Sequence, residues 1–99
     1  TAVRNGCSIV ALIGNDYRWN AEVQIQIDSF GADRVYGCDL DATANYADAA
    51  AGLGVYAATI QAEHDLDAAL TKAMTQDGPT CLNILIDSYA APKFVPLKL

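Results

Sequence analysis

Asn15 and Asp16 are the residues whose types and position most clearly suggest chemistry. They follow an apolar run at residues 9–13 and Gly14, and a polar segment typical of a helix comes next. A buried parallel strand that ends in small polar residues and leads into a helix is where α/β proteins bind anions and metals. Gly14 permits a tight turn, both side chains supply oxygen atoms, and the helix would direct its N–H groups at the same place.

Asp16 allows two interpretations. A carboxylate at a strand end can bind Mg²⁺, which usually takes one or two carboxylates together with phosphate and water oxygens. Alternatively, Asn15 or Asp16 simply caps the following helix, as these residue types commonly do. The three residues from Gly14 to Asp16 are too short a pattern to decide between the two.

Composition and charge narrow the class of protein. The chain has 99 residues, 53% of them hydrophobic, and a net charge of −6. We expect one small domain that binds neither nucleic acid nor an anionic membrane, because the six basic residues are scattered. No apolar run approaches the ~18 residues of a membrane span. With neither a signal peptide nor an initiator Met, we expect a cytoplasmic chain cut from a longer protein.

Three cysteines stand far apart, at Cys7, Cys38 and Cys81. Their spacing contains no Cys-x-x-Cys pair, which argues against a zinc site. We expect Cys7 and Cys81 to be small buried hydrophobic residues in a reducing compartment. For Cys38 a structural role is expected, with a reactive thiol as the alternative.

The apolar spacing predicts alternating strands and helices. Strands are expected at residues 8–13, 55–60 and 80–86, with a further possible short strand at 34–36. Helices are expected at residues 19–30, from a cap at Asp41 or Thr43 to Gly52, and at 63–75. This order predicts an α/β fold with a parallel sheet, flanking helices and right-handed crossovers. Three strands fit half a domain better than a whole one.

Further details follow from the helical period and from turn residues. Residues 1–4 read as the last turn of a helix that Gly6 closes. Residues 88–99 are expected to form an extended tail. The residues expected on the buried helix faces are Val23, Ile27, Phe30, Tyr46, Ala50, Leu53, Leu66, Leu70, Ala73 and Met74.

The segment 8–19 resembles the end of the thiamine diphosphate (TPP) motif. In that family a strand ending in Gly-Asp-Gly is followed by a helix and a second strand ending in Asn-Asn, and here Asn15-Asp16 takes the second position. Tyr46 followed by AAAGLG at 49–54, and DGP at 77–79 before the strand at 81–87, are similar to later segments of the family. The resemblance covers residues 1–87, and it is nearest to the acetolactate synthase, benzaldehyde lyase and oxalyl-CoA decarboxylase branch.

This resemblance implies a doubly wound, Rossmann-like TPP-binding domain, with Asn15 and its neighbours at the cofactor. Asp16 would be a side-chain Mg²⁺ ligand, and Arg18 would contribute its backbone carbonyl. The amides of Trp19, Asn20 and Ala21 would contact phosphate oxygens at the start of the helix. For the Trp19 ring, burial in the core or the site wall is favoured over direct cofactor contact.

Four other acidic or basic residues are candidates for a role in the site. Glu22 matches a family position that lines the substrate pocket, where a carboxyl relays protons, but an exposed first-turn glutamate is favoured. His64, the only histidine, is expected to be solvated on a helix surface. Asp39 and Asp41 are interpreted as a solvated pair of loop acids.

By resemblance, residues 1–87 are the C-terminal part of a TPP-binding domain. The parent enzyme would be a lyase or transferase that makes or breaks C–C bonds next to a carbonyl, acting on a 2-keto acid or related acyl donor. TPP and Mg²⁺ would be its cofactors, and we expect a homo-oligomer. The remaining motif residues would come from the rest of the enzyme or a partner subunit, so we do not expect this chain to be active alone.

Two alternatives stay open. In the first, the chain is a small self-standing α/β binding module without catalysis, and the Gly14-Asn15-Asp16 turn is only a cap. In the second, it is one chain of a split TPP enzyme.

Overall fold

The computed structural model describes residues 1–88, and the expected tail at 88–99 lies almost wholly outside them. The chain forms two compact units. The first combines Thr1–Asn15 with Thr43–Ile86, and the second contains Asp16–Ala42 together with Asp87 and Ser88. No helix in the described part of the chain is both long and apolar enough to cross a membrane.

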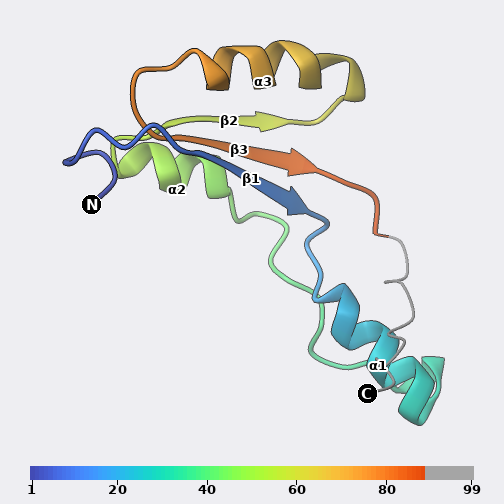
Figure 1. Ribbon diagram of the computed structural model, residues 1–99. Helices are drawn as coiled ribbons and strands as arrows, with labels where there is room; N and C mark the ends of the chain where they lie inside the picture. The colour runs from blue at the N-terminus through green and yellow to red at the C-terminus, as the bar shows by residue number, and fades with distance from the viewer. Residues whose placement is uncertain (89–99) are drawn as a thin grey trace, which may run out of the picture. The chain divides into compact units, whose positions relative to one another are not determined.

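The first unit is built on a parallel sheet of three strands, β1 (Val10–Asn15), β2 (Tyr56–Ile60) and β3 (Thr80–Leu85), in the order β1-β3-β2 (Figure 1). The register aligns Val10 and Tyr56 with Thr80, so all three strands end at one edge. The α/β class and the parallel sheet predicted from the apolar runs are therefore confirmed. The observed strand limits lie within two residues of those expected.

Helices α2 (Tyr46–Gly52) and α3 (Leu66–Met74) cover opposite faces of this sheet (Figure 1). A short 3₁₀ turn, Glu63–Asp65, precedes α3. Lys72 on α3 stacks its ammonium 5.0 Å from the ring centre of Tyr56. Thr59, three positions along the same strand, bonds to Asn45 at the start of α2. Successive residues of a strand face opposite sides, and so do residues three positions apart, so these two contacts mark the two faces.

The core of this unit lies along the central strand. Leu82 has no exposed surface, and Cys81, Ile60, Ala47 and Ala73 are buried around it. A parallel strand with neighbours on both sides and helices above and below is expected to be apolar throughout. β3 departs from this expectation, because Thr80 and Asn83 are also buried.

Several residues expected inside are exposed. Phe30 and Met74 are the last residues of their helices, and Leu53 follows the end of α2, so these side chains extend past the surfaces that the helices bury. Val23 and Ala73 are buried as expected. Cys7 was expected to be buried but is exposed, since it lies in the turn before β1, whereas Cys38 and Cys81 are buried.

Turn residues define the ends of the helices. Cys7 donates its amide to the Ala2 carbonyl and Gly6 to Val3, with Gly6 at φ +60°, which is the Schellman ending expected for residues 1–6. The cap of α2 is Asn45, which was not expected. Its side chain, rather than Thr43 or Asp41, accepts from the first amides of the helix.

The second unit contains α1 (Asn20–Phe30). The helix ends at Gly31, which has φ +95°, and this end was predicted from the glycine. The possible strand at 34–36 is wrong. Residues Ala32–Arg34 form a 3₁₀ turn, and extended pairing in this segment occurs instead at Asp39.

Candidate functional site

The carboxyl end of β1 delivers the chain to the candidate site. Asn15, its last residue, is buried, and its carbonyl accepts a hydrogen bond from the Ile86 amide at 3.1 Å. A Cβ on Gly14 would lie 3.3 Å from the Ile86 Cδ1 atom. The glycine therefore lets β1 and the end of β3 approach closely.

In the second unit, Asp16 begins a tight turn. Its Oδ1 atom accepts a hydrogen bond from the Arg18 amide at 3.0 Å, the pattern of an Asx turn. Tyr17, between them, has φ +53°, and it is the only non-glycine residue of the described chain with positive φ. This conformation costs about 1–2 kcal/mol for an L-residue, so other interactions must hold it.

The turn is paired with a segment that follows α1. Arg18 and Asp39 form an antiparallel bridge in which Trp19 donates to the Cys38 carbonyl and Leu40 to the Tyr17 carbonyl, each at 2.8 Å. The Arg18 Nε atom also donates to Asp39 Oδ1 at 2.8 Å. Asp39 is solvated as expected, with 81% of its side chain exposed, but it also forms an ion pair that was not expected, and Asp41 makes an interaction as well.

This pairing leaves two oxygen atoms available. Both bridge hydrogen bonds use the neighbours of Arg18, so its own N–H and C=O take no part in them. The N–H donates to Asp16 Oδ1, and among the described residues neither the Arg18 carbonyl nor the second oxygen of Asp16 accepts a hydrogen bond. A carboxylate and a backbone carbonyl are both hard oxygen ligands of the kind Mg²⁺ takes.

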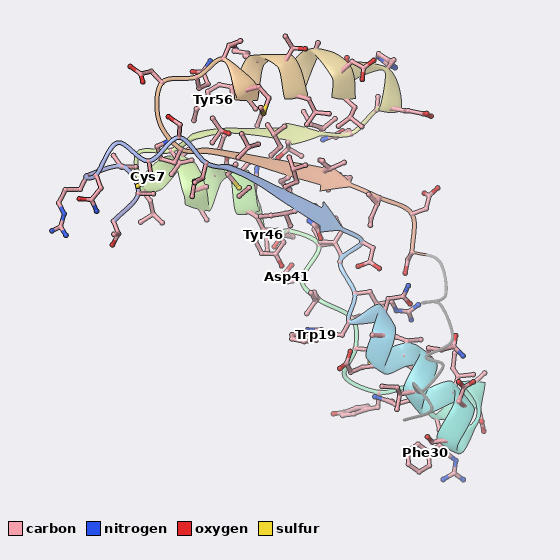
Figure 2. The ribbon with its side chains drawn as sticks, in the orientation of Figure 1. Cys7, Trp19, Phe30, Asp41, Tyr46 and Tyr56 are labelled. Carbon is pink, nitrogen blue, oxygen red and sulfur yellow. The ribbon has the colours of Figure 1, made fainter. Side chains whose placement is uncertain are left out.

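The start of α1 excludes the capping interpretation of Asp16. The helix begins at Asn20, and its N-cap is Trp19, which has no side-chain oxygen to offer. The Trp19 amide donates to the Cys38 carbonyl and so is not available for the phosphate contact expected of it. Trp19 is 57% exposed at the helix start, and a place in the core is wrong (Figure 2).

The remaining acidic and basic candidates are spread out. Glu22 is exposed in the first turn of α1. His64 is exposed, as expected, and lies 3.4 Å from Asp65. Within residues 1–88 no three His, Cys, Asp or Glu side chains gather as a metal site. The turn at Asp16 thus fits Mg²⁺ as part of a coordination shell that phosphate oxygens and further ligands complete.

Two contacts of this site were missed by the sequence analysis. Asp39 lies 21 positions from its partner Arg18, and Gln26 on α1 bonds to the backbone of Tyr36. Neither contact follows a local spacing rule, so no pattern in the sequence pointed to them.

A parallel α/β sheet with an oxygen-rich turn between a strand end and a helix defines a class of domain that binds phosphate-bearing cofactors. Comparison with protein families gives the particular family. Residues 1–84 match the family described as thiamine pyrophosphate enzyme, C-terminal TPP binding domain. The chain belongs to this family. It is thus a TPP-binding domain of a larger TPP enzyme, in which other domains or subunits accompany it.

Proposed function

We propose that the turn from Asp16 to Arg18 binds the Mg²⁺ ion that joins the diphosphate of TPP to this domain. Asp16 would contribute its carboxylate and Arg18 its backbone carbonyl. The amides of Asn20 and Ala21 would contact the phosphate oxygens at the start of α1. Asn15 precedes this turn in the sequence and would also contact the cofactor. The Trp19 ring would form a wall of the cofactor site.

One observation carries this proposal. The Asx turn and the bridge to Asp39 use the hydrogen-bonding groups around Arg18 but not its carbonyl. An oxygen atom held in a fixed place without a donor is suited to a cation.

We further propose that the enzyme belongs to the acetolactate synthase, benzaldehyde lyase and oxalyl-CoA decarboxylase branch, on the resemblance of its motifs. It would decarboxylate or ligate a 2-keto acid or related acyl donor. TPP when bound supplies the carbanion chemistry, and the protein supplies binding and orientation. Glu22 would line the substrate pocket and move a proton. We also propose that the enzyme is a homo-oligomer in the cytoplasm.

The test is Asp16→Ala in the full protein that carries this domain. We expect TPP affinity in the presence of Mg²⁺ to fall by ~10–100-fold, because the only carboxylate of the turn is lost. Isothermal titration calorimetry with TPP at fixed Mg²⁺ measures this change. Asp67→Ala is the matched control, since Asp67 is an exposed acid in the first turn of α3.

The proposal holds if only Asp16→Ala weakens binding and the loss disappears when Mg²⁺ is omitted from both proteins. Equal Mg²⁺-dependent affinity in Asp16→Ala and the unsubstituted protein overturns it.

A further inference from the structure

A segment after α1 is held against the turn at Asp16 by several independent contacts. We call residues 36–40 the brace. Its backbone makes the two 2.8 Å hydrogen bonds with Tyr17 and Trp19, and Asp39 adds the ion pair with Arg18. These interactions all lie within the second unit.

The brace is itself anchored on α1 by one side chain. Gln26 Oε1 accepts from the Tyr36 amide at 2.8 Å, and Gln26 Nε2 donates to the Tyr36 carbonyl at 3.1 Å. The same nitrogen lies 3.2 Å from the Sγ atom of Cys38, which is buried. A glutamine amide that satisfies both backbone groups of one residue acts like a neighbouring strand.

We propose that Gln26 and Asp39 are positioning residues for the metal turn. Tyr17 stays at positive φ, and the Arg18 carbonyl keeps its direction, because the brace bonds to the residues on each side of Arg18. Without the brace, Tyr17 relaxes to negative φ and the carbonyl turns away. The brace therefore orders the turn before the cation arrives, which lowers the entropic cost of binding. This inference rests on the proposed function of Asp16 and Arg18.

The first test examines the turn without cofactor. Gln26→Ala in the full protein should speed hydrogen exchange of the Trp19 and Leu40 amides about fivefold or more, because both hydrogen bonds to Tyr36 are lost. The matched control is Gln24→Ala on the same helix, because within residues 1–88 the Gln24 side chain bonds to Asp28 of that helix and not to the brace. Gln26→Glu keeps the acceptor for the Tyr36 amide and should show a smaller effect, which guards against misfolding of the alanine variant.

The second test is a double-mutant cycle between Arg18→Ala and Asp39→Ala, read as TPP affinity at fixed Mg²⁺. Arg18→Ala removes the guanidinium and keeps the carbonyl. Each single variant should weaken binding about twofold to fivefold, and the double variant no further, because both remove one interaction.

The outcomes separate this inference from the function on which it rests. Unchanged exchange in Gln26→Ala overturns the brace. If Gln26→Ala exchanges faster but keeps its TPP affinity, while Asp16→Ala does weaken TPP binding, the positioning role is overturned. Additive losses in the cycle overturn the role of Asp39. If Asp16→Ala itself leaves binding unchanged, the proposed function fails, and the exchange result still decides whether the brace orders the turn.

Discussion

Thr59 on β2 donates its hydroxyl to the side-chain oxygen of Asn45 at 3.2 Å, and that oxygen also accepts from the amides of Ala47 and Asp48. One atom thus caps α2 and ties the helix to the sheet. The Nδ2 atom of the buried Asn83 lies 3.5 Å from the same Thr59 hydroxyl, which extends the polar contacts to the central strand.

Asn45→Ala should therefore destabilise the start of α2 by about 1–2 kcal/mol, because a cap and a tertiary hydrogen bond are lost together. Hydrogen exchange at Ala47 and Asp48 measures this effect. Asn45→Ser keeps a capping oxygen and should recover part of the loss. Equal exchange in the alanine variant and the unsubstituted protein would contradict the cap.

Leu82→Ala should lower the free energy of unfolding by about 2–5 kcal/mol, since the side chain is fully buried in the central strand and its removal leaves a cavity. Urea denaturation measures the loss. Leu12→Ala is the comparison, because Leu12 is 54% exposed on β1 and should cost less than about 1 kcal/mol. Similar costs at both positions would place the core elsewhere.

Two glycines near the end of α2 should respond in opposite directions. A Cβ on Gly52 meets nothing within 4 Å and the residue is helical, so Gly52→Ala should stabilise by about 0.5–1 kcal/mol. Gly54 has φ +83°, so Gly54→Ala should destabilise by about 1 kcal/mol. Thermal unfolding of the two variants measures the contrast, and a shift of the same sign in both would refute it.

Asp16→Asn tests the charge of the metal turn. The amide oxygen remains a ligand but one negative charge is lost, so the Mg²⁺ concentration for half-maximal TPP binding should rise about threefold to tenfold. At saturating Mg²⁺, TPP should bind at least as tightly, because repulsion between the carboxylate and the diphosphate is gone. Removing Mg²⁺ with EDTA should release TPP from both proteins. An unchanged Mg²⁺ requirement would argue against ligation by Asp16.

The elements of the fold could be predicted because they follow local rules. The apolar runs at 9–13 and 81–86 predicted strands, although Ile9 and Leu12 of the first run are exposed. Gly6 and Gly31 ended helical turns at positive φ. Burial at helix ends was not predictable in this way. Phe30 and Met74 continue the helical period, but whether a neighbour reaches them depends on how far the packed surface extends.

In the candidate site too, only the features that follow a local sequence pattern could be predicted. Asp16 could be proposed from the sequence because its position after a strand is visible in the chain, and the family match supports the TPP that the resemblance predicted. Asp39 and Gln26 were not found, because their contacts depend on a backbone reversal after α1 that no residue pattern announced.

β1 is an outer strand of the sheet, and among the described residues only β3 pairs with it. An outer strand with unpaired backbone groups and an exposed leucine can pair with the backbone of another chain. The chain, when expressed by itself, should therefore aggregate as its concentration rises, and Leu12→Lys, which places a charge on that strand, should keep it dispersed in light-scattering measurements.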